Sequence, residues 1–226
     1  LYGLAGLPVT MGDDLRTLPP ERCGLLRRIL PTVDIHPMDL SRKQRGTEYA
    51  LLNLAVCRRF GSWNVAAVTN FTAEPLRLTL HLDADLRLDC GEGRRYAVCD
   101  YWNQSFLGLF AEALPLEVSP CDTAVLRITP FEGRPEIIFT SRHLTQGAVE
   151  LRDVRRTEDG SLSGTALCVP GEEWRMMVLL PEGWGLLGAD STIPMEISRG
   201  EGGLLLDVVF HPEREKEVRW ELRFRH

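Results

Sequence analysis

Alternation of apolar and polar residues predicts β-structure over most of the chain beyond residue 46. In LRLTLHLD, residues 76–83, every second position from Leu76 to Leu82 is leucine and the positions between are polar, so one face of this strand is expected to be buried. Residues 217–226 alternate in the same way, and their inward positions are Val218, Trp220, Leu222 and Phe224. Short strands separated by Gly, Ser and Pro turns are typical of a β-sandwich. We therefore predict a mainly β protein.

The predicted strands form two groups, which we assign to two β-sandwich modules. An antiparallel β-sandwich is expected over residues 46–130 and a second, small β-sandwich over residues 149–226, with residues 131–148 as a bridging segment. A module of roughly 75 residues has a marginal core of its own. The second sandwich is therefore expected to lean on the first.

The first 45 residues follow a different pattern. Residues 1–12, LYGLAGLPVTMG, are apolar without alternation and rich in small residues, which predicts a strand covered on both faces, as in a parallel sheet. Residues 19–30, PPERCGLLRRIL, begin with two prolines and then place apolar residues at helical spacing, and Pro31 follows them, so a helix is predicted. A single β/α unit cannot bury its own apolar surface. Residues 1–45, which end in a polar connector, are thus expected to need a neighbour.

Composition narrows the class of protein. The net charge of −6 at pH 7 argues against nucleic acid as a partner, because nucleic-acid binding needs a basic face. No apolar run reaches the ~18 residues of a membrane helix, so no membrane contact is expected. The six cysteines are widely and irregularly spaced, which fits neither a zinc site nor a disulfide scaffold. We expect buried free thiols and, from them, a cytoplasmic location.

The sequence carries few signs of catalysis. The five histidines show no metal-ligand spacing, and the chain has no nucleophile elbow, P-loop or dinucleotide-binding glycine motif, so no metal and no cofactor are expected. The elbow between the predicted strand and helix holds Asp13, Asp14 and Arg16. One of these carboxylates could face a substrate, or it could pair with Arg16 and bind backbone N–H groups of the loop. Adjacent carboxylates rarely converge as the acid and base of a glycosidase, so we do not assign that pair here.

Three tryptophans are candidates for stacking on sugar rings, because an aromatic face offers an apolar surface to a pyranose: Trp184, Trp102 and Trp63. Trp184 lies in the turn-rich run PEGWG and is the best placed for exposure. Such residues more often pack inside a core. A carbohydrate-binding module with exposed aromatic side chains is therefore an alternative function.

Several runs resemble one family of enzymes. LAGLPVTMGDDLRTLPPERCGLLRRIL, followed by DIHPMDL, resembles the last strand and helix of the catalytic barrel of α-galactosidase-like glycoside hydrolases, the melibiase clan of families 27 and 36. WNVAAVTNFTAEPLRLTL, VCDYWNQSFLG and TAVLRITP resemble the β-sandwich that follows that barrel, and TSRHLTQGAVEL resembles a segment of bacterial relatives. The resemblance spans about residues 3–150.

The resemblance implies that residues 1–45 are the terminal β/α unit of a (β/α)₈ barrel whose other units precede Leu1. It implies that the chain is a non-catalytic C-terminal region, because the family's catalytic carboxylates lie on earlier barrel strands and no position here matches them. Asp13, Asp14 and Arg16 match the elbow and carry over only as substrate-rim or structural positions. Asp13 stands where the family typically has Asn, which weakens a substrate contact there.

The implied partner is the rest of the parent barrel, and carbohydrate and a second copy of the chain stay open as further partners. An interaction domain that pairs with a separate barrel chain is a third interpretation. It predicts a large exposed apolar patch formed by residues 1–30, since this unit would lack its neighbours.

Overall fold

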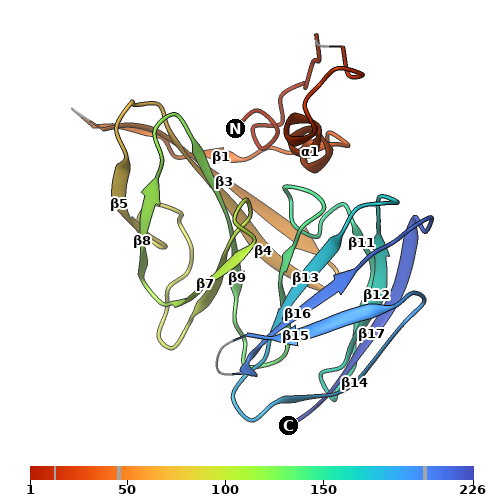
Figure 1. The fold of residues 1–226 in the computed structure, drawn as a ribbon. Coiled ribbons are helices and arrows are strands. Elements are labelled where there is room, and N and C mark those ends of the chain that lie inside the picture. The colour runs from red at the N-terminus through yellow and green to blue at the C-terminus, as the bar shows by residue number, and fades with distance from the viewer. Residues whose placement is uncertain (13, 45–46, 201–202) are drawn as a thin grey trace.

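The computed structural model describes residues 1–12, 14–44, 47–200 and 203–226. Figure 1 shows two β-sandwiches side by side, with residues 1–37 and their short helix lying across one end of both. We call residues 1–37 the N-terminal segment. The chain ends at the far end of the second sandwich. The protein is thus mainly β, as predicted.

The first sandwich pairs a large antiparallel sheet with a two-stranded one. The large sheet has the order β1-β3-β4-β9-β6-β7, with β2 added along β3. Its strands are β1 (Met38–Asp39), β2 (Arg42–Gln44), β3 (Thr47–Arg58), β4 (Gly61–Asn70), β6 (Tyr96–Asp100), β7 (Ser105–Phe110) and β9 (Thr123–Pro130). The small sheet pairs β5 (Leu76–His81) with β8 (Ala113–Val118). Leu76 and Leu80 of β5 are buried, which confirms the face predicted from alternation.

The second sandwich consists of two four-stranded antiparallel sheets. One has the order β10-β13-β16-β15 and the other β11-β12-β17-β14. The first of these contains β10 (Glu136–Thr140), β13 (Trp174–Leu179), β15 (Met195–Arg199) and β16 (Leu205–Phe210). The second contains β11 (Leu151–Arg156), β12 (Leu162–Leu167), β14 (Gly185–Ser191) and β17 (Glu217–Arg225). The predicted inward face of β17 is buried, from Val218 to Phe224.

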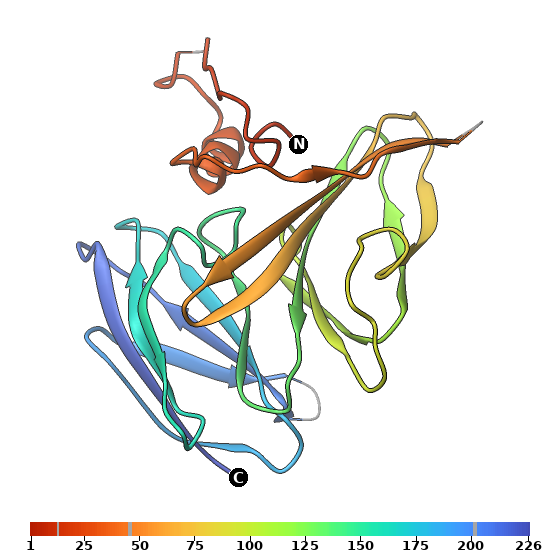
Figure 2. The ribbon, with the colours of Figure 1, turned by 180° about the vertical axis from the view of Figure 1, so that it is seen from behind.

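The two sandwiches share a third core. Trp63 and Val65 of β4 pack in the same buried cluster as Phe139 of β10 and Met177 of β13. The four sheets therefore form four successive layers, with one core inside each sandwich and a central core between them. Figure 2 shows the long β3–β4 hairpin running from the first sandwich alongside the second. The second module leans on the first through these contacts.

The N-terminal segment contains the predicted helix but not the predicted strand. Helix α1 runs from Pro20 to Ile29 and has proline in its first turn. Residues 1–7 form turns instead, in which the backbone N–H groups of Leu4 and Ala5 donate to the carbonyl oxygen of Leu1. A strand covered on both faces needs neighbouring strands for its hydrogen bonds, and here the first residues bond to one another. The prediction of a strand over residues 1–12 was therefore wrong for this structure.

The stretch predicted as a bridge, residues 131–148, contains a strand. β10 pairs with β13 and lies in the second sandwich. After β10 the chain enters a loop at residues 141–150, here called the junction loop, which is almost entirely buried. This loop lies between the two sandwiches and the N-terminal segment, and it holds that segment in place.

The cysteines are free thiols in the structure, but only Cys99 and Cys168 are buried, whereas Cys57 and Cys121 are exposed. The expectation of buried thiols therefore holds for only part of the set. Among the described residues, no helix combines the length and apolar character that crossing a membrane requires.

Candidate functional site

The elbow residues form a local ion pair. The carboxylate of Asp14 accepts hydrogen bonds from Nε and Nη2 of Arg16 at 2.9 and 2.8 Å, and from the Arg16 backbone N–H at 3.0 Å. The Arg16 guanidinium lowers the pKa of Asp14 through these bonds. Both side chains are exposed, and their hydrogen bonds join residues of the same loop. Asp13 lies outside the described residues.

Trp63 is not available to a sugar. It is 2% exposed, its indole N–H donates to the carbonyl oxygen of Thr145 at 3.0 Å, and the guanidinium of Arg127 lies 4.2 Å from its ring centroid. The ring is therefore part of the central core, and Trp63 is ruled out as a carbohydrate-stacking residue. Trp174 is buried as well, in the core of the second sandwich.

Trp102 and Trp184 are half-buried and lie on different sandwiches. The Trp102 ring meets Tyr101 edge-on at 5.0 Å, and the Arg28 guanidinium lies 5.9 Å from its centroid. The Trp184 ring packs edge-on against His226 at 5.5 Å. The structure thus does not bring the three predicted stacking residues together into one aromatic platform.

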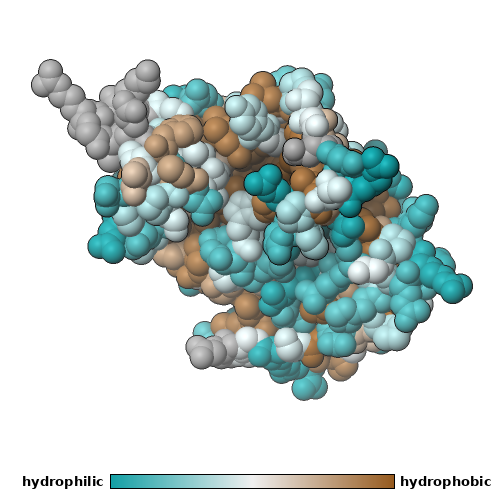
Figure 3. Space-filling model, turned by 45° about the horizontal axis from the view of Figure 1, so that its top comes forward, coloured by the Kyte–Doolittle hydropathy of each residue, from teal (hydrophilic) through white to brown (hydrophobic). Residues whose placement is uncertain are grey.

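Exposed apolar side chains concentrate on the N-terminal segment and the strand that follows it. Among the described residues, seven of the eleven exposed large hydrophobic side chains lie within residues 1–38: Leu1, Tyr2, Leu7, Met11, Leu15, Leu25 and Met38. Helix α1 has no buried residue. Figure 3 views this end of the molecule and shows hydrophobic atoms around the segment, interspersed with hydrophilic ones. We call these seven side chains the apolar end surface.

The junction loop holds the C-terminal end of α1. Nη1 of Arg142 donates to the carbonyl oxygens of Arg27 and Leu30 at 2.6 and 3.0 Å, and the backbone N–H of Leu144 donates to the carbonyl oxygen of Arg28 at 2.9 Å. The last carbonyls of a helix lack partners within the helix, so these bonds from another element satisfy them. The basic and polar content of the run TSRHLTQG is the one feature of the sequence that relates to this docking.

His143 extends this docking by one residue. Its Nε2 lies 3.1 Å from the carbonyl oxygen of Pro31, and its Nδ1 accepts a hydrogen bond from the backbone N–H of Thr145 at 3.2 Å. A carbonyl can only accept, so Nε2 carries the proton and the ring is neutral. Burial, partly offset by the bond to Pro31, lowers the pKa of His143 to about 4. The neutral imidazole is therefore a fixed structural link between loop and segment.

Behind the loop lies a buried ionic group that the sequence did not indicate. Arg127 is fully buried and donates to the carbonyl oxygens of Ile137, at 2.6 Å, and Gln146. Burial lowers its pKa to about 10, which leaves the guanidinium charged at neutral pH. Glu150 is also fully buried, accepts a bond from Thr140 Oγ1 at 2.6 Å, and has its pKa raised by burial. These groups join sheets and loop rather than open onto a cleft.

A surface groove of about 590 Å³ lies on the outer face of the β11-β12-β17-β14 sheet. Its cross-strand neighbours Asp190 and Glu221 share the guanidinium of Arg223, at 2.6 and 3.5 Å. Both carboxylates are exposed. A general acid for glycosidic cleavage needs a carboxyl kept protonated by an apolar site, which this groove does not provide. Among the described residues, no group of three His, Cys, Asp or Glu side chains is arranged to hold a metal ion.

No family model matches the chain. No curated protein matches it either. Solved structures do match parts of it. A GH27 β-L-arabinopyranosidase from Geobacillus stearothermophilus aligns at 17% identity with a TM-score of 0.48, covering 59% of this chain and 29% of the enzyme.

Two other solved structures also match the chain. α-Galactosidase I from Mortierella vinacea aligns at 15% identity with a TM-score of 0.45, covering 56% of this chain and 33% of that one. The isomalto-dextranase from Arthrobacter globiformis T6 aligns at 12% identity with a TM-score of 0.41, covering 98% of this chain and 43% of the enzyme. The chain thus spans less than half of each of these proteins.

Proposed function

We propose that this chain is the non-catalytic C-terminal β-sandwich region of an α-galactosidase-like glycoside hydrolase. In this role it supports a catalytic β/α barrel, and the N-terminal segment is the part that joins the barrel. The motifs of residues 3–150 and the succession of helix and β-sandwiches support this proposal. Carbohydrate breakdown is the activity of the whole enzyme, and the chain contributes stability to it.

The apolar end surface is the observation that carries the proposal, and an interaction domain that pairs with a separate barrel chain would present the same surface. Tyr2 is 69% exposed, Leu15 54% and Leu25 51%, although all three are apolar or aromatic. A concentration of such side chains in one region is typical of a surface that another part of a protein covers. The opposite side of the same segment is already fixed to the sandwiches by Leu4, Ile29 and the junction loop. The apolar end surface therefore lies on a segment whose other side is packed against the two sandwiches.

The arrangement of the acids supports a structural role. The buried carboxylate of Glu136 pairs with Arg156 at 3.0 Å, and Glu150 faces Thr140 inside the core. The exposed pair in the outer groove shares one arginine. Hydrolysis of a glycoside needs two carboxyl groups about 5 to 9 Å apart on either side of the sugar. The four carboxylates named here instead bind arginine or threonine side chains, which supports a structural role.

The first test is an activity assay. The purified chain is incubated with an aryl α-galactoside, and we expect no turnover above that of a heat-denatured sample. Turnover that copurifies with the chain through two further columns would contradict a non-catalytic role.

The second test is assembly. The barrel region that this proposal places before Leu1 is produced separately and mixed with the chain, and complex formation is followed by gel filtration. We expect a complex with the unmodified chain and its loss in the double variant Leu15→Ser, Leu25→Ser. Leu187→Ser is the matched control, because Leu187 is 63% exposed on the second sandwich, away from the apolar end surface. Equal assembly of both variants would contradict the proposed surface.

A further inference from the structure

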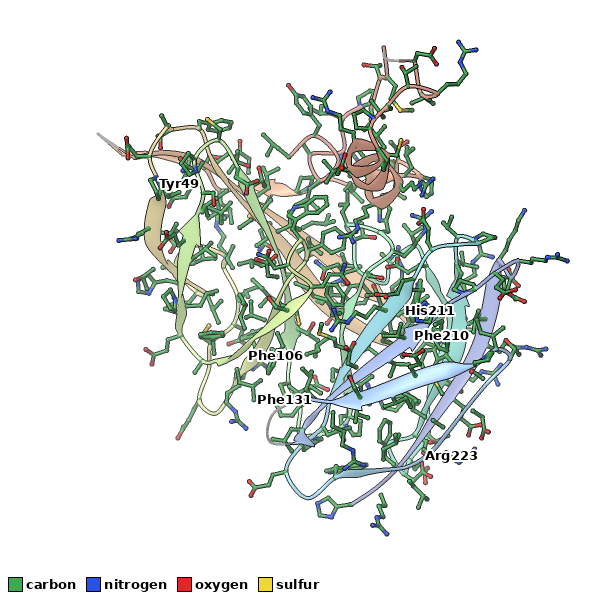
Figure 4. All side chains as sticks on the ribbon, in the orientation of Figure 1. Tyr49, Phe106, Phe131, Phe210, His211 and Arg223 are labelled. Carbon is green, nitrogen blue, oxygen red and sulfur yellow. The ribbon has the colours of Figure 1, made fainter. Side chains whose placement is uncertain are left out.

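A cleft of about 290 Å³ lies where four parts of the chain meet. Its walls come from α1, from the turn between β6 and β7, from the start of the junction loop, and from residues 169–174, which lead into β13. The lining side chains include Arg27, Arg28, Arg142, Gln104, Ser141 and Glu172. We call it the arginine cleft. Its volume is at the lower end of the range of small-molecule sites, about 300 to 1,000 Å³. Figure 4 shows side chains in the region between the helix and the two sandwiches.

Two of its arginines have no acidic partner among the described residues. Arg27 forms an ion pair with Glu172. Arg28 instead lies over the rings of Tyr101 and Trp102, 5.7 and 5.9 Å from their centroids. Arg142 uses Nη1 for backbone carbonyls of α1. Glu173 lines the cleft as well, so three arginines face the two carboxylates of Glu172 and Glu173, and a net positive charge remains.

The contact with aromatic rings suits Arg28 to a carboxylate. A guanidinium held over an aromatic face keeps the N–H groups on its edge free to donate, and its planar fork matches the two oxygens of a carboxylate. Because the rings restrict its side chain, less conformational entropy is lost when a ligand binds. Arg28 is half-buried, so water competes less for its charge than at an exposed site.

Gln104 indicates a second chemical group that a ligand of the arginine cleft would carry. Its backbone has a φ of 48°, a conformation that few residues other than Gly, Asn and Asp adopt readily. Its side-chain oxygen Oε1 is buried and accepts no hydrogen bond from any described residue. A buried acceptor without a donor is unfavourable. Because Oε1 has almost no accessible surface, the Gln104 side chain would have to turn toward the cleft for a hydroxyl group of a bound molecule to satisfy it.

We propose that the arginine cleft binds a small hydroxylated carboxylate. The carboxylate would pair with Arg28 and Arg142, and a hydroxyl would donate to Gln104 Oε1. The site does not depend on the barrel-supporting role and would exist in the chain alone. Since its walls come from α1, the junction loop and both sandwiches, a bound ligand would also fasten α1 to both sandwiches.

The test compares four probes on the intact chain by isothermal titration calorimetry. D-Galacturonate has both a carboxylate and hydroxyls, D-galactose has only hydroxyls, acetate has only a carboxylate, and inorganic phosphate is an anion of another shape. We expect D-galacturonate to bind at least tenfold more tightly than each of the others. Equal binding of galactose, acetate or phosphate, or no binding of D-galacturonate, would overturn the proposal.

Variants on two separate elements then locate the site. Arg28→Gln should weaken D-galacturonate binding at least tenfold, and Arg28→Lys should weaken it less because the charge remains. Gln104→Asn shortens the side chain while keeping a residue that tolerates positive φ, and it should also weaken binding. Arg22→Gln, at an exposed position of the same helix, is the control and should bind as the unmodified chain does. Unchanged affinity in both Arg28→Gln and Gln104→Asn would overturn the assignment.

Discussion

The guanidinium of Arg127 lies 4.2 Å from the centroid of the Trp63 ring, with both side chains fully enclosed between the two sandwiches. Trp63 belongs to β4 and Arg127 to the neighbouring strand β9. Trp63 then reaches the junction loop through Thr145, and Arg127 reaches it through Gln146. One cation and one aromatic ring therefore connect the first sandwich to the loop that holds the N-terminal segment.

Replacing Arg127 should destabilise the protein strongly. Arg127→Ala removes the donor to the carbonyl oxygens of Ile137 and Gln146 and leaves a cavity against Trp63. Loss of one member of a buried polar network costs about 3 to 5 kcal/mol, so the free energy of unfolding in urea should fall by that order. Arg59→Ala, at an exposed turn position, is the control, and its change should stay within about 0.5 kcal/mol. A loss below about 1 kcal/mol for Arg127→Ala would show that the network is not needed for stability.

The shared central core predicts a single unfolding transition. Exposing Phe139 or Met177 would require separating the second sandwich from Trp63 and Val65 of the first, so neither sandwich keeps its full burial alone. Scanning calorimetry should therefore give one peak, with a ratio of calorimetric to van't Hoff enthalpy close to one. Two resolved peaks, or a ratio near two, would mean that the sandwiches unfold independently.

The sequence predicted elements whose burial alternates and missed those whose burial does not. β5 and β17 each bury every second side chain, so their period of two was visible. β10 is buried at all five positions because it lies between two cores, and its run EIIFT therefore shows no alternation. α1 was visible from its prolines and apolar spacing, whereas the same apolar content misled the prediction of residues 1–12. Their small residues serve close packing of turns instead of a strand.

The sequence alone did not predict which residues of the candidate site are buried. Trp63 and Trp184 are the same residue type, and the positions of Arg127 and the junction loop enclose the ring of Trp63. The junction loop contains Thr145, Gln146 and Glu150, which are polar and would ordinarily indicate a surface loop. Their burial follows from partners far away in the chain, which no local pattern encodes.

Stability should depend on pH through His143. Burial holds its pKa at about 4, below the ordinary value of 6.5. The unfolded chain therefore takes up a proton near pH 6.5 that the folded chain does not take up until about pH 4, so the stabilisation is complete above pH 7 and is lost as the pH falls. Between pH 7 and pH 5 this group alone should cost on the order of 2 kcal/mol.

Comparison with a variant isolates this contribution, because burial raises the pKa of Glu136 and Glu150 and their effect has the opposite sign. His143→Gln keeps a donor for the carbonyl oxygen of Pro31 but cannot titrate. Its free energy of unfolding, measured in urea at pH 5 and pH 7, should change less unfavourably on acidification than that of the unmodified chain, by on the order of 2 kcal/mol. His81→Gln, at an exposed position, is the control and should follow the unmodified chain. An identical pH dependence in His143→Gln would exclude His143 as the titrating group.

Docking of the N-terminal segment should depend on Gly6. Its φ is 70°, and a Cβ atom at this position would lie 2.2 Å from the carbonyl oxygen of Ile35, a backbone atom that cannot move aside alone. Gly6→Ala should therefore displace the turn of residues 1–7 from the residues that follow α1, at a conformational cost of about 1 to 2 kcal/mol before the clash is counted. Gly12→Ala is the matched control, because a Cβ atom there meets nothing within 4 Å. Hydrogen exchange followed by mass spectrometry should show faster exchange in the N-terminal segment of Gly6→Ala and unchanged exchange in β4 and β17. Equal protection of the segment in the two variants would mean that the turn is not held by this contact, and the proposed presentation of the apolar end surface would lose its structural basis.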